Sequence, residues 1–177
     1  MTKRLLHNAH VIDPEAGTVS HGDIRIENGM ITQVSQSPLS ASPNEHAVDC
    51  HGKYLAPGII DIGVKVCEPG ERHKESFKSA GLAAAAGGIT TMVTRPDTTP
   101  AIDSPETLEF IARRANQATP VNVMPMAALT KGRNGREMSE ISFLIDAGAI
   151  AFTDCDHVVS NPKVFARALS YACALGA

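Results

Sequence analysis

Residues 59–66 read IIDIGVKV, and this short segment decides the fold class. Its alternation of apolar and other residues is typical of a β-strand with two different faces. A two-residue period places Ile60, Ile62, Val64 and Val66 on one face and Asp61, Gly63, Lys65 and Cys67 on the other. We expect the apolar face to pack under helices. The other face carries a carboxylate and an ammonium group and must therefore meet a polar interior. A (β/α) barrel provides such an interior at the C-terminal ends of its strands, where its active sites are built.

The sequence after this strand alternates strand-like and helix-length segments, which indicates βα units and a parallel sheet. We expect further strands at residues 90–96, 121–129 and 149–154, and helices at residues 75–88, 105–117, 136–148 and 162–176. Ser104 is the expected N-cap of the second helix, with Pro105 at its first position, and Gly87-Gly88 is expected to end the first helix. Roughly four such units give an α/β fold that is about half of an eight-unit barrel.

The sequence before residue 54 is expected to form a small β unit of its own. It contains strand-like segments separated by a turn at residues 14–17 and by Asn28-Gly29, a strong hairpin signal. Residues 37–46 are rich in Ser and Pro and read as a loop. We therefore divide the chain into residues 1–53, an N-terminal β portion, and residues 54–177, the first half of a (β/α) barrel.

The composition is that of an ordinary globular protein and argues against several kinds of partner. Of the 177 residues 43% are hydrophobic, and the formal net charge of -3 with scattered cations offers no footprint for nucleic acid. No apolar stretch suits a membrane span and the N-terminus lacks the apolar core of a signal peptide, so we expect a cytoplasmic protein without membrane contact. The four cysteines lie far apart without a CxxC pair and are expected to be free thiols: Cys50, Cys67, Cys155 and Cys173.

Residues 54–111 read YLAPGIIDIGVKVCEPGERHKESFKSAGLAAAAGGITTMVTRPDTTPAIDSPETLEFI, and the segments MAALTKGRNGREMSEI and GAIAFTD follow later in the chain. Together, and in this order, these motifs resemble the dihydroorotase family of cyclic amidohydrolases. The resemblance implies the N-terminal half of a (β/α)8 barrel of amidohydrolase type, preceded by part of a small β-sandwich. It also implies a zinc-dependent activity of pyrimidine biosynthesis, the reversible cyclisation of carbamoyl-aspartate to dihydroorotate.

The sequence departs from the family pattern where the chemistry is done. The family's HxH pair of zinc ligands falls on Gly63 and Lys65, and its substrate-binding arginine falls on Cys67. Glycine has no donor atom, and an ammonium group repels a metal ion. The asparagine of an MPNT-like motif falls on Asp97, which follows Arg95. Only Asp154, at a metal-binding aspartate of the family, keeps a ligand-type residue.

The resemblance therefore assigns no catalytic residue, Arg95 and Asp97 as substrate-binding candidates, and Asp154 as the one remaining metal-ligand position. Zinc hydrolysis needs the metal to lower the pKa of bound water. Without ligands we expect no cofactor and a non-catalytic dihydroorotase-like protein, a homo-oligomer or a structural partner of aspartate carbamoyltransferase. The alternative is an active cyclic amidohydrolase whose zinc site is rebuilt from residues beyond position 177. A third reading is a binder of an anionic metabolite through Arg95 and Lys131.

The vacated strand end carries two further hypotheses. The ammonium group of Lys65 could take the place of the metal ion and pair with Asp61 or Asp154, which would be a structural contact rather than a catalytic one. Among the seven histidines, His157 is the one to consider as a substitute ligand, because it follows Asp154 and Asp156 closely. Cys67 and Cys155 are interpreted as fillers of the emptied pocket.

Overall fold

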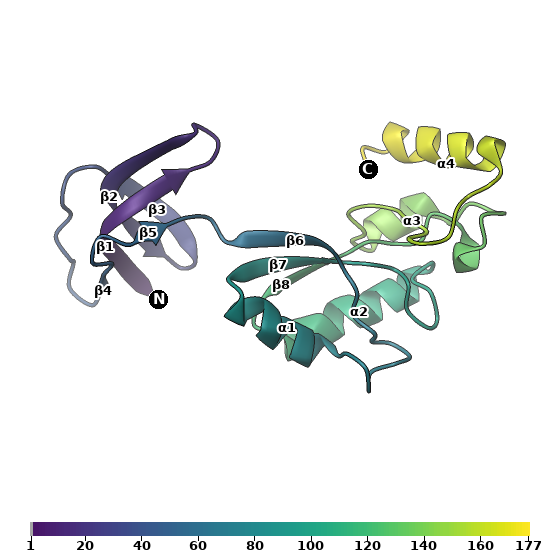
Figure 1. The fold of residues 1–177 in the computed structure, drawn as a ribbon, viewed down its shortest axis with the longest axis horizontal. Coiled ribbons are helices and arrows are strands. Elements are labelled where there is room, and N and C mark those ends of the chain that lie inside the picture. Colours follow the sequence, from purple (N-terminus) through teal and green to yellow (C-terminus); the bar gives the residue numbers. More distant parts are fainter. Residues whose placement is uncertain (1) are drawn as a thin grey trace. The chain divides into compact units, whose positions relative to one another are not determined.

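A computed structural model describes residues 2–177 of the chain. The chain divides into two compact units, Met1–Pro57 and Gly58–Ala177. The first unit holds the five strands up to residue 55, and the second holds the remaining strands and all of the helices (Figure 1).

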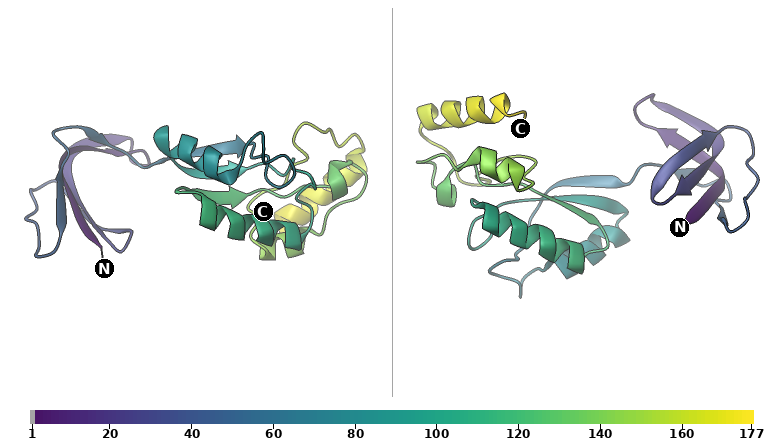
Figure 2. Two further views of the ribbon diagram at one scale, coloured as in Figure 1. Left: turned by 90° about the horizontal axis from the view of Figure 1, so that it is seen from below. Right: turned by 180° about the vertical axis from the view of Figure 1, so that it is seen from behind.

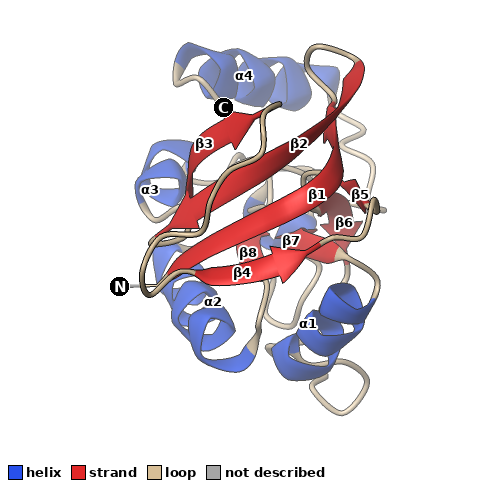
Figure 3. Cartoon of the chain, turned by 90° about the vertical axis from the view of Figure 1, so that its left-hand side faces the viewer, coloured by secondary structure: helices blue, strands red, loops and turns tan. Residues whose placement is uncertain are grey.

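The first unit is a five-stranded sheet. Its strands are β1 (Lys3–Asp13), β2 (Thr18–Glu27), β3 (Met30–Ser35), β4 (His46–Asp49) and β5 (Tyr54–Leu55). They follow the order β3-β2-β1-β4 (Figure 3), and β5 pairs with a later part of β1 than β4 does. The predicted hairpin at Asn28-Gly29 is confirmed, with positive φ at both residues as its tight turn requires. Strand β5 pairs parallel with β1, so residues 54 and 55 are tied to this sheet.

A buried carboxylate fixes the loop that follows β3. Asp23 is 5% exposed, and its two oxygens accept hydrogen bonds from the backbone N–H groups of Asn8 at 2.9 Å and Leu39 at 2.7 Å. Burial opposes ionisation, but these bonds outweigh it and lower the pKa of Asp23. The carboxylate therefore holds the loop segment near Leu39 against strands β1 and β2.

The second unit is built on a parallel sheet of β6 (Ile59–Val64), β7 (Ile89–Thr94) and β8 (Asn122–Pro125), in that order. Helices α1 (Phe77–Ala86) and α2 (Pro105–Ala118) lie on the same face of this sheet (Figures 1 and 2). Strand β7 pairs parallel with both of its neighbours, so the carboxyl ends of β6, β7 and β8 lie at one edge. These βα units are the α/β arrangement that the sequence predicts.

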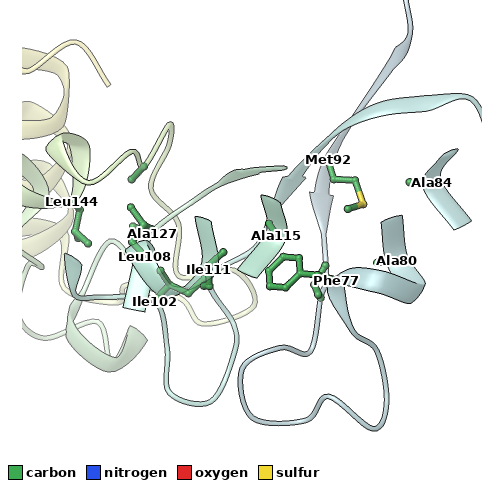
Figure 4. Packing of buried hydrophobic residues seen from close by; sticks show 12 residues of the cluster. Phe77, Ala80, Ala84, Met92, Ile102, Leu108, Ile111, Ala115, Ala127 and Leu144 are labelled. Atoms are coloured by element: carbon green, nitrogen blue, oxygen red, sulfur yellow. The ribbon is translucent and has the colours of Figure 1, made fainter. Parts of the chain in front are cut away.

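The main core lies between the sheet and the two helices. Phe77, Leu108 and Ile111 are almost completely buried there, and Met92 of β7 packs into the same cluster (Figure 4). Helix α1 presents small residues to this core, including Ala80 and Ala84, which lets it approach the strands closely.

The predicted helix boundaries around the core are confirmed. Ser104 is the N-cap of α2, and its hydroxyl accepts from the N–H of Thr107, with Pro105 at the first position. Helix α1 ends at Ala86, Gly87 is its C-cap, and Gly88 has a positive φ of 80°. These two helix ends could be predicted from the sequence because N-cap and C-cap positions favour particular residue types.

The predicted faces of the first strand are partly wrong. A bulge between Ile62 and Val64 interrupts the two-residue period, so Gly63 has no partner on β7. Val64 and Val66 pack with the core as expected. Ile60 and Ile62, which we expected under helices, are 60% and 74% exposed, because β6 is the edge strand of the sheet.

The predicted strand at residues 149–154 is also wrong as a full strand. Only Phe152 forms a parallel bridge, to Ala127, although backbone hydrogen bonds continue on either side of it. Pro125 has no N–H to donate towards this segment, although its carbonyl oxygen accepts from the Ile150 N–H, so the ladder between the two segments is short. The expected helix at residues 136–148 is reduced to α3 (Ile141–Asp146), preceded by the 3-10 turn η1 (Lys131–Arg133), and α4 (Pro162–Ala174) follows.

Within residues 2–177 no helix combines the length and the apolar character that crossing a membrane requires.

Candidate functional site

The residues that the sequence singled out follow the ends of the parallel strands. Lys65 follows β6, and Arg95 begins the segment after β7. Asp97 lies two residues further on, and Asp154 follows the bridge at Phe152. The carboxyl ends of neighbouring parallel strands share one edge of a sheet, and this is where ligands bind in open and closed α/β folds.

Asp97 is clamped between two cations. The Lys65 Nζ and the Arg95 Nη2 each lie 2.9 Å from the same Asp97 oxygen, Oδ2. The Asp97 side chain is only 2% exposed, whereas the Lys65 side chain is 53% exposed. The pair that we expected between Lys65 and Asp61 or Asp154 is therefore wrong, because the carboxylate that Lys65 contacts is the one at the family's asparagine position.

This clamp keeps Lys65 charged. The hydrogen bond to Asp97 raises the pKa of Lys65 above its ordinary value. Burial alone would lower the pKa of Arg95, but the charge of Asp97 outweighs it and raises that pKa. Two cations thus share one carboxylate, and the cluster carries a net positive charge at neutral pH.

Three buried polar atoms at this strand end have no hydrogen-bond partner within the described residues. They are Thr94 Oγ1, Arg95 Nε and Asp97 Oδ1. Natural proteins pair nearly all buried polar atoms with a hydrogen-bond partner, so this edge of the sheet has more hydrogen-bonding groups than the described residues satisfy. These atoms lie close together in the sequence, on the last residue of β7 and on two of the three residues that follow it.

Gly63, which the sequence resemblance assigns to the position of a zinc-ligating histidine, has a backbone conformation that differs from that of an ordinary strand residue. Its φ is +95°, in a region that L side chains rarely adopt. A Cβ atom added there would meet nothing within 4 Å. The space for a side chain is present, but the backbone favours glycine.

Asp154 is engaged with the loop that follows β8. It is 5% exposed, its Oδ1 accepts from the Thr130 N–H at 2.9 Å, and its Oδ2 accepts from the Thr130 hydroxyl. The same hydroxyl accepts from the Gly135 N–H at 2.8 Å. The carboxylate that resembles a metal ligand therefore holds the first residues of this loop.

Asp156 connects the loop to the clamp. Arg133 Nη2 lies 2.5 Å from Asp156 Oδ1, and Arg95 Nη2 lies 3.9 Å from the same oxygen. Arg133 also donates from Nε to the Asp154 carbonyl at 3.2 Å. Ion pairs thus run from Lys65 through Asp97, Arg95 and Asp156 to Arg133.

Two residues considered from the sequence do not join these ion pairs. Lys131 pairs with Glu137 at 2.5 Å and Glu140 at 3.8 Å. His157 is exposed, and its Nδ1 lies 2.9 Å from the Arg133 carbonyl oxygen. The anion-binding reading through Arg95 and Lys131 loses support, because both cations already have carboxylate partners.

The cysteines of this region are free thiols, as expected. Cys155 has a positive φ of 58° and is partly buried. Burial, and then the charge of Asp97, raise the pKa of its thiol above the ordinary value. A raised pKa disfavours the thiolate, so Cys155 is suited to filling space rather than to nucleophilic attack.

Sequence reasoning missed Glu68. This carboxylate is 5% exposed; it accepts from the Arg114 Nε at 2.7 Å and from the Phe77 N–H at 3.0 Å. Arg72 Nε lies 3.6 Å from the same oxygen as Arg114. The spacing of Glu68 and Arg72, four residues apart directly after the first strand, was the available signal. Glu68 ties the segment after β6 to the beginning of α1 and to α2.

The residues at these strand ends do not fit a divalent metal ion. Within residues 2–177 no group of three or more His, Cys, Asp and Glu side chains is arranged to hold one. The positions that would supply nitrogen ligands are a glycine and a charged lysine already bound to Asp97. A cation placed there would meet the ammonium group and the guanidinium group of Arg95.

Comparison with known proteins gives one consistent family and one fold. Residues 52–177 match the family described as dihydro-orotase-like. The chain is 37% identical over 172 residues to a dihydroorotase of Sulfurihydrogenibium sp., covering 97% of this chain and 40% of that protein. It is 36% identical over 176 residues to a dihydroorotase of Aquifex aeolicus, covering 99% of the chain and 41% of the relative. The chain thus spans about two fifths of the length of these relatives.

Solved structures resemble it in fold. An L-hydantoinase from Arthrobacter aurescens superposes with a TM-score of 0.74 at 22% identity, covering 86% of this chain and 32% of that one. A D-hydantoinase superposes with a TM-score of 0.78 at 19% identity, covering 99% and 39%. The predicted fold class, an α/β barrel of amidohydrolase type represented by its N-terminal portion, is confirmed by these likenesses.

Proposed function

This chain belongs to the dihydroorotase-like family, and we propose that it serves pyrimidine biosynthesis as a non-catalytic member of that family. Its role is then assembly rather than turnover. The proposal includes a cytoplasmic location, which rests on the similarity to dihydroorotases.

The observation that carries the proposal is the contact of Lys65 with Asp97. A zinc hydrolase needs a metal ion to polarise the scissile carbonyl and to lower the pKa of bound water to about 7. In this chain a protonated lysine lies at one of the ligand positions, 2.9 Å from the Asp97 carboxylate. The protonated ammonium group has no lone pair for a metal ion, the Asp97 oxygen Oδ2 is already shared by Lys65 and Arg95, and the side chain of Gly63 offers no donor.

The substrate-binding candidates Arg95 and Asp97 fit this proposal better as a structural pair. The negative charge of Asp97, at the asparagine position, is offset by Arg95 and Lys65 rather than presented to a ligand. Because Asp97 is 2% exposed, a substrate would have to displace one of the two cations to reach it. We infer that the segment after β7 keeps the conformation of a substrate-binding loop but no longer binds a substrate.

The test is a dihydroorotate ring-opening assay at neutral pH in zinc-supplemented buffer, with zinc content measured on the same sample. The dihydroorotase of Aquifex aeolicus provides the positive control under identical conditions. We expect substoichiometric zinc and a rate equal to the protein-free buffer. Stoichiometric zinc together with turnover would overturn the proposal in favour of an active amidohydrolase with a rebuilt site, in which Asp154 is the residue to examine first.

We further propose that the chain works as an oligomer or as part of a larger assembly. Strand β6 is an edge strand whose Ile59, Ile60 and Ile62 are 57%, 60% and 74% exposed. Unpaired strand edges with apolar side chains favour pairing with another surface. Aspartate carbamoyltransferase is the heterologous partner that we propose, and co-sedimentation of the two purified proteins tests it; separate sedimentation at micromolar concentrations would remove that partner.

A further inference from the structure

A cavity of about 390 Å³ lies away from the strand-end cluster, between the segment that precedes α3 and the first turns of α4. Arg136, Lys163 and Arg167 lie on its wall and supply three cationic groups. Its volume lies in the range of small-molecule sites. None of these three residues belongs to the clamp around Asp97.

The three cations are free to meet a ligand. In the part of the chain that the structure describes, none of them forms an ion pair with a carboxylate, whereas Lys131 pairs with both acidic residues of the wall, Glu137 and Glu140. Those two contacts raise the pKa of Lys131 and offset the negative charge at the cavity. The charge that remains is positive.

The geometry of α4 adds to this charge. Lys163 and Arg167 are four residues apart and therefore on one face of the helix. Asn161 caps the helix by accepting from the Lys163 N–H at 3.0 Å. Val164, the third residue of α4, lines the cavity, and the N–H groups of a first helical turn have no partner within the helix. The positive end of the helix dipole thus lies beside three cations.

We propose that this cavity binds a small dianionic metabolite, through carboxylate or phosphate groups held by Arg136, Lys163 and Arg167. Two guanidinium groups supply the planar pairs of donors that match carboxylate and phosphate oxygens. Met138 and Val164 are partly buried in the same wall and give contact to a short apolar body between the charges. This proposed binding site is independent of the proposed loss of catalysis, so either proposal can fail without affecting the other.

The test is calorimetric titration of the chain at pH 7 and low ionic strength with inorganic phosphate and, separately, with succinate. Sodium chloride at matched ionic strength controls for general screening. We expect saturable binding of at least one probe; the stronger probe identifies phosphate or dicarboxylate as the preferred group. In two-dimensional NMR the backbone amides of Lys163 and Val164 should shift with the same saturation curve.

Arg167→Gln should weaken this binding by about tenfold or more, the loss expected for one charge-assisted contact. Arg113→Gln is the matched control, because Arg113 is an exposed arginine of α2 outside the cavity. Equal affinity in both variants would overturn the proposal, as would an absence of saturable binding. Binding of an acidic peptide with no response to phosphate or succinate would also overturn it, by identifying the cavity as a protein-docking surface.

Discussion

The ammonium group of Lys65 lies 2.9 Å from Asp97. The contact is at the strand end to which the family resemblance assigns a metal ion. Arg95 contacts the same carboxylate oxygen at the same distance. The contact unites two replaced positions, one after β6 and one after β7. Lys65 adds a second cation to a buried carboxylate that Arg95 already contacts, so Asp97 has two counter-ions.

Asp97→Asn should destabilise the chain by about 1 to 3 kcal/mol, less than a fully buried pair would lose because Lys65 and Arg95 are partly exposed. The variant leaves two cations side by side without their shared counter-ion. Urea denaturation followed by circular dichroism measures the change. Asp146→Asn, at the exposed end of α3, is the control and should change the stability by less than about 0.5 kcal/mol. Equal effects of the two substitutions would contradict the clamp.

Glu68→Gln should destabilise the chain by about 2 to 4 kcal/mol, since it removes a buried charge that faces Arg114 and Arg72. Burial opposes the ionisation of Glu68, but the bonds from Arg114 and the Phe77 N–H outweigh it and hold its pKa below the ordinary 4.5. A lowered folded-state pKa gives stability that is present above pH 4.5 and is lost as the pH falls through the folded-state value.

The pH dependence provides the check on Glu68. The difference in unfolding free energy between the chain and Glu68→Gln should be constant at neutral pH and should shrink as the pH falls below about 4.5. Urea titrations at several pH values measure it. A difference that grows towards acid pH would mean that Glu68 is not held ionised by its arginine partners.

Gly63→Ala should cost about 1 kcal/mol or more although the position is open, because alanine at a φ of +95° is strained. Gly87→Ala is the contrasting substitution. Gly87 has a φ of -84°, and an added Cβ would make only ordinary contacts, so this change should be neutral or stabilising by up to about 1 kcal/mol. Thermal unfolding compares the two, and an unaffected Gly63→Ala variant would contradict the bulge.

Ile62→Lys should reduce self-association, because it places a charge on the exposed edge strand β6. Analytical ultracentrifugation over a range of concentrations measures the assembly. Val19→Lys, at a residue of β2 that is 56% exposed, is the matched control and should leave association unchanged. A chain that is monomeric at every concentration would count against the proposed oligomer.

Local signals in the sequence predicted much of the fold. The Ser104-Pro105 start, the Gly87-Gly88 end and the Asn28-Gly29 hairpin each depend on the conformational preference of one or two residues, and each is confirmed. The exposure of Ile62 was not predictable in the same way, because the bulge at Gly63 and the edge position of β6 depend on which strand pairs with it.

The site was predicted at the level of positions but not of contacts. The motif pattern located Lys65, Arg95 and Asp97 after strands, and the structure places them after β6 and β7, whereas Asp154 follows only the isolated bridge at Phe152. The pairing of Lys65 with Asp97 requires the register of β6 on β7, which no local pattern contains. Glu68 was missed for the same reason, since its main partner, Arg114, comes from a helix much later in the chain.

The central claim is that a lysine–aspartate contact stands where a metal ion would bind. Crystals grown with zinc, with data collected at the zinc absorption edge, test it most directly. We predict no anomalous peak at the ends of β6 and β7, with Lys65 still in contact with Asp97. An anomalous peak there, coordinated by Asp154 or Asp97 with the lysine displaced, would contradict the account.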